Sequence, residues 1–251
     1  MRALRILLIV VVVLGGLFVA VDRIAVGFAE DKAADKLRTS EGLSSTPDVS
    51  IKGFPFLTQV VSGSLDDVQV GIKDYEASAS GGIGGAKGPD KIRIDELTAE
   101  MRGVAFSGDY SSATADKASG TARISYAELL KAAQVETVQV APGVTANVVG
   151  LSDGGDGKIK VEVEATVLGK KIPEPVSVLS TATVEGDVVK VRADALPKFG
   201  DVPVAEDRIR TITDFQQMIS RLPAGIELDK VEAAPDGVNV SVKGSAVRLV
   251  G

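Results

Sequence analysis

The stretch IKVEVEATV, from Ile159 to Val167, decides the fold class of this chain. Its apolar and polar residues alternate without interruption, which is the pattern of a β-strand with one buried and one solvated face. Strands of this kind are typical of antiparallel sheets. Similar alternation recurs at 49–51, 65–72, 92–106, 188–196 and 238–242. The sequence therefore predicts a mostly antiparallel sheet.

The composition agrees with strands built from small branched residues. Apolar residues make up 45% of the chain and aromatic residues only 4%, and Trp is absent. Most of the apolar content is Val, Ala, Leu and Ile, and valine-rich alternation favours strands. Within 92–106 the apolar phase changes between Ile94 and Leu97, which predicts a β-bulge near Glu96.

Two short amphipathic helices are predicted between the strands. SYAE at 125–128 and TDFQ at 213–216 both have the spacing of a capping box. The second helix is predicted over 213–222. Each helix is followed by strand-like segments around an Asp-Gly turn, at 156–157 and at 236–237, which is a hairpin signal. A repeated helix-plus-hairpin unit and a chance resemblance between the two halves are both open interpretations.

The N-terminus carries an uncharged run, ILLIVVVVLGGLFVAV, at 6–21, after Arg2 and Arg5 and before Asp22. Its 16 residues span about 24 Å as a helix, against a hydrocarbon core of about 30 Å. We expect residues 1–21 to be a retained anchor, because no good small-residue cleavage site precedes Asp22; a cleaved signal peptide is the alternative. Basic residues stay on the cytoplasmic side. Residues 22–251, opening with a helix over 22–38, would then form one extracytoplasmic domain of a single-pass plasma-membrane protein, or a secreted protein after cleavage.

Residue types missing from the chain narrow its chemistry. The absence of Cys and His removes disulfides, thiolate metal sites, the commonest general base and the commonest zinc ligand. A net charge of −6 argues against nucleic acid as a partner. The glycine-rich segment at 78–90 has neither the phosphate-loop nor the dinucleotide spacing and is interpreted as a flexible loop. We therefore expect no catalytic residue, no metal and no cofactor.

The segment GFPF is the most suggestive of a ligand. Phe54 and Phe56 flank Pro55, and on an extended segment they would face the same way. They are either a plug in the sheet core or a pair of apolar lipid anchors. The second predicted helix has an apolar stripe formed by Phe215, Met218, Ile219 and Leu222. This stripe either packs in the core or forms a lid over a trough in the sheet. The candidate lipid-binding residues are Phe54, Phe56, Phe215, Met218, Ile219 and Leu222.

The chain resembles the LmeA-like phospholipid-binding proteins of the actinobacterial cell envelope. The resemblance covers the anchor, the helix after it, VSIKGFPFLTQVVSGSLDDVQV at 49–70, YAELL at 126–130 and LPAGIELDKVEAAPDGVNVSVKGSAVRL at 222–249. It implies phospholipid binding and assistance in building mannosylated envelope glycolipids. It also implies a fold similar to tubular lipid-binding domains, in which a long curled sheet and a helix enclose an apolar groove. No catalytic motif comes with the family.

We therefore expect an α+β protein with a long, curled, mostly antiparallel sheet and a few helices enclosing an apolar groove, after an N-terminal transmembrane helix. The expected function is non-enzymatic binding, and in addition transfer, of phospholipid. The expected partners are phospholipid, the plasma membrane and envelope glycolipid synthesis enzymes. One alternative is a structural or scaffolding envelope protein with a fully packed core. The second is a carboxylate-dependent enzyme acting on envelope glycans, since paired carboxylates suffice for glycoside chemistry.

Overall fold

The computed structural model describes residues 2–78, 91–109, 111–133, 137–196, 210, 213–218, 222 and 224–250. Residues 79–90 of the predicted glycine-rich loop lie outside this range. The helices are α1 (Arg2–Ser40), α2 (Phe56–Ser62) and α3 (Tyr126–Ala133). The strands are β1 (Asp48–Lys52), β2 (Ser64–Ser78), β3 (Lys91–Phe106), β4 (Ala113–Ser125), β5 (Val138–Ala141), β6 (Val144–Asp153), β7 (Ile159–Val167), β8 (Lys170–Lys171), β9 (Val176–Glu185), β10 (Val188–Ala193), β11 (Phe215–Met218), β12 (Ile226–Ala234) and β13 (Gly237–Val250).

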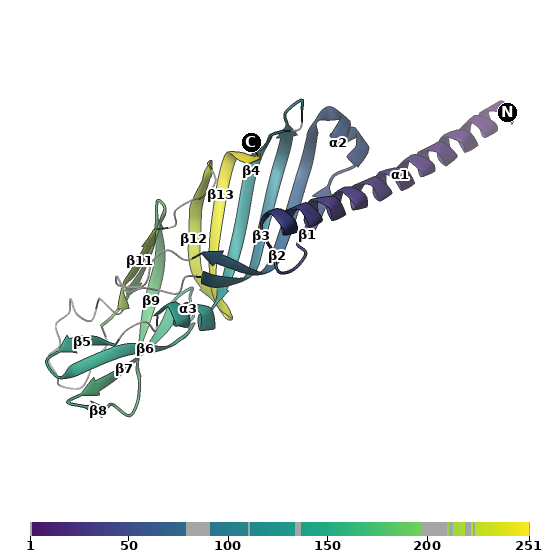
Figure 1. The fold of residues 1–251 in the computed structure, drawn as a ribbon. Helices are drawn as coiled ribbons and strands as arrows, with labels where there is room; N and C mark the ends of the chain where they lie inside the picture. Colours follow the sequence, from purple (N-terminus) through teal and green to yellow (C-terminus); the bar gives the residue numbers. More distant parts are fainter. Residues whose placement is uncertain are drawn as a thin grey trace.

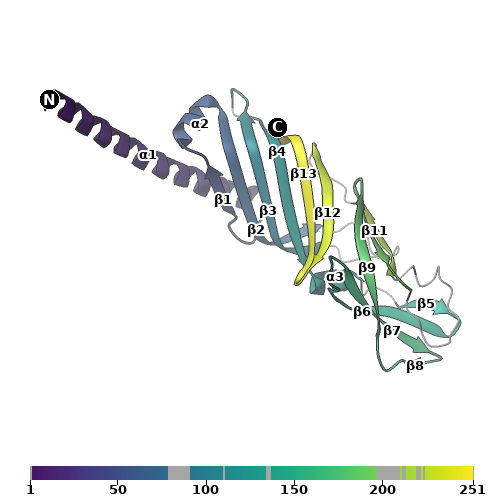
Figure 2. The same cartoon turned by 180° about the vertical axis from the view of Figure 1, so that it is seen from behind.

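The strands form two antiparallel sheets, which we call sheet A and sheet B. Sheet A has the order β1-β2-β3-β4-β13-β12 and curls into a half-barrel. Sheet B has the order β11-β10-β9-β7-β6-β5, with β8 beside β7. Figures 1 and 2 show sheet B at one end of the molecule and the first half of α1 projecting from the other. The predicted mostly antiparallel sheet structure, with few helices and a long apolar N-terminal helix, is confirmed, whereas the enclosed apolar groove stays a prediction.

The larger core lies where sheet B meets α3 and the β12–β13 edge of sheet A. Its members are mostly valines of alternating strands, such as Val163 of β7 and Val231 of β12. Both predicted Asp-Gly turns are hairpins, since β6 pairs with β7 and β12 pairs with β13. Tyr126 opens α3 and donates its hydroxyl to the carbonyl of Ala234 over 2.9 Å, which fixes this helix against the second hairpin.

A smaller core lies at the other end of sheet A, beneath α1 and α2. Val26 of α1 and Phe56 of α2 pack there on Leu65, Val104 and Ala115. The carboxylate of Asp22 accepts the backbone N–H of Leu57 over 2.8 Å and the guanidinium of Arg23 over 2.7 Å. Because the first N–H groups of a helix lack partners within the helix, this buried carboxylate attaches the start of α2 to α1.

The helix predicted over 213–222 is wrong. The backbone of Phe215–Met218 is strand β11, which pairs antiparallel with β10. The Asp214 carboxylate, expected to lie at the start of a helix, accepts the N–H of Ala193 at the end of β10 over 3.1 Å. This contact aligns the following residues with the free edge of β10, so ladder hydrogen bonds replace the local helix signal. The repeat of helix plus hairpin is therefore incomplete.

The prediction of a β-bulge near Glu96 is also wrong, because the irregularity found there is of another type. The apolar phase does change there, but the β2–β3 ladder keeps one register, with Ile72 opposite Leu97 and Tyr75 opposite Ile94. Between these pairs the ladder omits Asp74 and Asp95, and Asp74 has a φ of 53°. Both strands contribute one residue to the irregularity, so the side chains change phase without a shift of register.

Candidate functional site

One face of sheet A carries an uncharged strip that is half-buried and crosses four strands; we call it the apolar band. The ladder pairs place Val70 opposite Ala99, Ala99 opposite Gly120, and Gly120 opposite Val242. The neighbouring ladder rows on either side are paired in the same way. Val68, Met101 and Ala118 form one row, and Ile72, Leu97, Ala122 and Val240 form the other. The band consists of Val68, Val70, Ile72, Leu97, Ala99, Met101, Ala118, Gly120, Ala122, Val240 and Val242.

One core adjoins the band at one end of β2 and β3, the other core adjoins its β13 side, and the part between them stays open. Val68 and Met101 contact the core under α1 and α2, whereas Val240 and Val242 contact the core against sheet B. Seven members belong to neither of these cores and stay half-buried: Val70, Ile72, Leu97, Ala99, Ala118, Gly120 and Ala122. The band is therefore an apolar surface that the described part of the chain covers incompletely.

Small residues keep the middle of the band low. At Gly120 an added Cβ would lie 3.1 Å from the carbonyl oxygen of Thr98 and 3.2 Å from a methyl group of Val242. Ala118 and Ala122 stand on the same side of β4, two residues before and after this glycine. A floor of Gly and Ala bounded by Val, Leu and Ile offers hydrocarbon contact and no hydrogen-bonding side chain.

A row of irregular positions across sheet A keeps the apolar side chains on one face. Asp66, Gly103, Asp116 and Ala246 lie side by side in β2, β3, β4 and β13, and the ladders omit them. Gly103 has a φ of 61° and Ala246 a φ of 50°. Each strand gains one residue here, so Leu65 and Val68 pack in the same core although three positions separate them. The row thereby joins the band to the core under α1.

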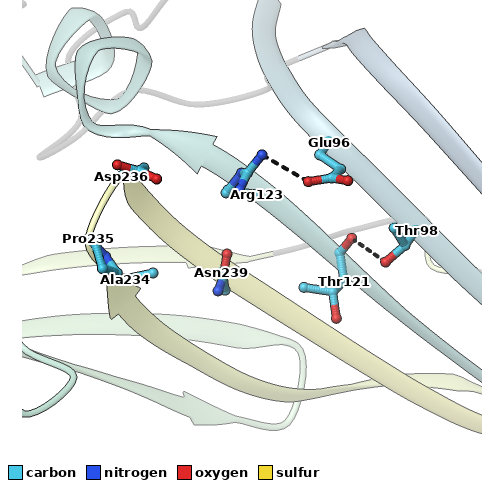
Figure 3. Close-up of a pocket in the computed structure, with 8 residues that line it drawn as sticks. All are labelled: Glu96, Thr98, Thr121, Arg123, Ala234, Pro235, Asp236 and Asn239. Atoms are coloured by element: carbon cyan, nitrogen blue, oxygen red, sulfur yellow. Dashed lines mark hydrogen bonds and ion pairs between the residues drawn. The ribbon is translucent and has the colours of Figure 1, made fainter.

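The opposite face of sheet A is polar and holds a shallow pocket of about 290 Å³ (Figure 3). The Arg123 guanidinium lies 2.8 Å from the Glu96 carboxylate across it, and Thr98 donates its hydroxyl to the carbonyl of Thr121 over 3.5 Å. Because these residues alternate with members of the band, the pocket lies on the other side of the sheet from it. Its cation is already neutralised by a carboxylate.

A second polar pocket, of about 530 Å³, lies on sheet B. Arg192 and Arg210 line it, and the Asp214 carboxylate lies 3.5 Å from the first guanidinium and 3.2 Å from the second. Within the described ranges no group of three or more His, Cys, Asp or Glu side chains could hold a metal ion. On the two sheets, the feature that offers an apolar ligand a surface is thus the apolar band.

The structure separates the predicted pair Phe54 and Phe56. Helix α2 begins at Phe56, so the segment is not extended through both residues as expected. Phe56 is 6% exposed and belongs to the core under α1, whereas Phe54 is 56% exposed in the preceding loop. The Arg23 guanidinium lies 5.3 Å from the centre of the Phe54 ring. The prediction that both rings face one way is wrong.

The other predicted residues that the structure describes, Phe215, Met218 and Leu222, lie at the sheet B end of the molecule. The backbone of Phe215 and Met218 belongs to β11 in sheet B, and Ile219 is outside the described residues. Leu222 is half-buried against the core of sheet B. The band itself includes residues of β4 that we did not predict as a strand. Its signal is the spacing of Ala118, Gly120, Ala122 and Ile124, which is easily missed because Ala and Gly are poor strand formers.

Helix α1 is the one described helix that is long and apolar enough to cross a membrane. Its most apolar window has a mean hydropathy of 2.9, and none of that window is buried. The helix continues without a break from the apolar run into the part that packs on sheet A. Such a helix is compatible with a single-pass anchor and with a signal sequence.

The searches of the curated proteins and of the solved structures found no match. A family model of LmeA-like phospholipid-binding proteins matches residues 20–243, which include α2, α3 and the whole apolar band. This match covers most of the chain and agrees with the resemblance found in the sequence. The chain therefore belongs to the LmeA-like phospholipid-binding family.

Proposed function

We propose that this protein binds phospholipid without catalysis, by placing acyl chain on the apolar band of sheet A. The observation that carries the proposal is the uncharged, half-buried middle of the band between two closed cores. Burying hydrocarbon there removes apolar surface of both partners from water, which is worth about 0.8 kcal/mol for each methylene.

The length of the band along the strands is close to the thickness of the hydrocarbon layer of one membrane leaflet. Four residue steps separate Val68 from Ile72, which is about 13 Å along a strand. Half of a hydrocarbon core is about 15 Å. An acyl chain lying along the strands would thus contact Ala99, Gly120 and their neighbours over most of its length.

In this proposal α1 is retained, with Arg2 and Arg5 on the cytoplasmic side and the two sheets outside. A tethered domain with an open apolar face suits handing lipid between the membrane and an enzyme. Assistance in envelope glycolipid assembly, with the synthesis enzymes as partners, is the role that the family resemblance implies. We propose both lipid transfer and this role for the present chain.

The test is native mass spectrometry of the full chain released from phospholipid nanodiscs, using two neighbouring substitutions on β4. Ala118→Phe fills the band, whereas Ser119→Phe adds the same ring to the opposite, exposed face. We expect bound phospholipid on the parent chain and on S119F, and strongly reduced lipid on A118F, with similar thermal melts for both variants.

Two results would contradict the proposal. A parent chain that carries no lipid would favour the scaffolding alternative with a fully packed core. Equal lipid on A118F and S119F would show that lipid binds elsewhere.

A further inference from the structure

Just beyond the apolar run, α1 has two opposite faces. Asp22 and Val26 turn toward α2 and the core and are buried. Ile24 and Phe28 are 73% and 65% exposed. Residues three or four apart share a helix face, so Ile24 and Phe28 continue the line of Val21 from the run. The membrane-type surface of α1 therefore extends past Asp22 on the side that does not contact the domain.

This extension is longer than the length by which the run falls short of a full membrane span. From Val21 to Phe28 the helix advances about 10 Å at 1.5 Å per residue. The run is about 6 Å shorter than a hydrocarbon core of about 30 Å. Asp31 and Asp35, the next residues on the same line, are exposed acids and end the apolar stripe.

Two further exposed apolar side chains lie in the α2 segment, which packs against α1. Phe54 is 56% exposed and Val61 on α2 is 87% exposed. Both views show α2 at the edge of sheet A from which α1 projects (Figures 1 and 2). Phe54 is tied to α1 directly, because the Arg23 guanidinium lies over its ring and is 3.5 Å from the carbonyl oxygen of Gly53.

Cations accompany both aromatic rings. The Arg23 guanidinium lies 5.3 Å from the centre of the Phe54 ring, and the Lys32 ammonium lies 5.6 Å from that of Phe28. At a membrane surface, long basic side chains keep their apolar stems in the lipid and their charge at headgroup level. An aromatic ring with a cation above it therefore fits the boundary between acyl chains and lipid phosphates.

We propose that Ile24, Phe28, Phe54 and Val61 form an apolar collar that sits in the interfacial layer of the bilayer crossed by α1. Its partner is the phospholipid surface itself. Interfacial apolar faces lie about 5–10 Å deep, which agrees with the length of the stripe. The inference rests on the proposed function, because it takes α1 as a retained anchor. The collar gives sheet A a fixed position next to the lipid that the band would take up.

The chain contains no Trp, so single Trp substitutions report depth without background. The full chain would be reconstituted into phosphatidylcholine nanodiscs with bromine near the headgroup end or near the methyl end of the acyl chains. The collar reporters are Phe28→Trp and Phe54→Trp. Phe18→Trp in the run is the reporter of the anchor, and Leu168→Trp, 82% exposed at the far end of sheet B, is the matched exposed control.

We expect blue-shifted emission from F28W and F54W, with a greater loss of fluorescence for bromine near the headgroups than for deep bromine. F18W should be quenched by both lipids and L168W by neither. Unquenched F28W and F54W beside a quenched F18W would overturn the collar and leave the anchor in place. A blue shift without quenching would indicate a protein contact and also overturn it. An unquenched F18W would refute the anchor and the collar together, while lipid binding is judged separately by mass spectrometry.

Discussion

Strands β7 and β3 have similar alternating sequences but differ in how far their apolar side chains are covered. In β7, Ile159, Val161, Val163 and Ala165 are all between 0% and 6% exposed. In β3, Leu97, Ala99 and Met101 are half-buried, and Val104 is buried only where α1 and α2 cover the sheet. The apolar face of β7 meets α3 and the hairpin of β12 and β13, whereas the middle of β3 meets no second layer in the described chain. The same pattern thus forms a closed core in one place and a half-buried apolar face in the other.

The largest expected effect tests the closed half of this comparison. Val163→Asp places a carboxylate where the side chain is fully buried. Its desolvation costs several kcal/mol, which is comparable with a typical free energy of unfolding of about 5–15 kcal/mol. We expect loss of the cooperative thermal melt, measured by circular dichroism.

The open half is tested by the matched substitution Val70→Asp in the band. There water can still reach the new carboxylate, so we expect a cooperative melt and loss of co-purifying phospholipid in native mass spectrometry. If V70D unfolds as V163D does, the band is closed core and the comparison fails.

A second test compares the two phenylalanines at the α2 end. Phe56 is in the core under α1 and Phe54 is exposed. Phe56→Ala should therefore lower the free energy of unfolding by about 3–5 kcal/mol, and Phe54→Ala should change it by less than about 0.5 kcal/mol. Denaturant unfolding of both variants measures the difference. Equal destabilisation would mean that the two rings share one environment.

A third test concerns how α2 is held over the closed end of sheet A. Asp22→Ala removes the buried acceptor of the Leu57 N–H and of the Arg23 guanidinium. We expect a lower melting temperature than for the parent chain, with a smaller change than in F56A. Asp22→Asn keeps one acceptor oxygen and should retain more stability than D22A. Identical melts for D22A and the parent chain would exclude a capping role.

The smallest expected effect is at the surface of sheet B. The Lys158 ammonium and the Thr181 hydroxyl, each 2.7 Å from the Asp194 carboxylate, hold the pKa of Asp194 below its ordinary value of 3.8. A lowered pKa stabilises the fold above the ordinary value, and this stabilisation is lost as the pH falls through the folded-state pKa. Exposed pairs are weak, so Asp194→Asn should show a slightly flatter acid decline in melting temperature. A large difference between the pH dependences of the melting temperatures of D194N and the parent chain would contradict this expectation. It would show that surface ion pairs, and not only the core, stabilise sheet B.

The elements that follow from local sequence were predictable. Uninterrupted alternation gave β7, the Asp-Gly pairs gave two hairpins, and the apolar run gave the start of α1. Strand β4 escaped prediction because its apolar face is built from Ala and Gly, whose preference for strands is low. The same small residues keep the floor of the band low, so the feature that hid the strand is also the one that shapes the candidate site.

The sequence by itself determined the fold class, the apolar N-terminal helix and the chemistry that is missing, because strand period, helix length and residue types are local properties. Tertiary structure decided which apolar side chains are covered, because burial depends on partners far along the chain. It turned 215–218 into an edge strand beside β10, buried Phe56 under α1 while leaving Phe54 at the surface, and left the middle of sheet A uncovered between two cores. Alternation predicts that a strand has one apolar face. Only tertiary packing decides whether other parts of the protein cover that face or leave it open to lipid.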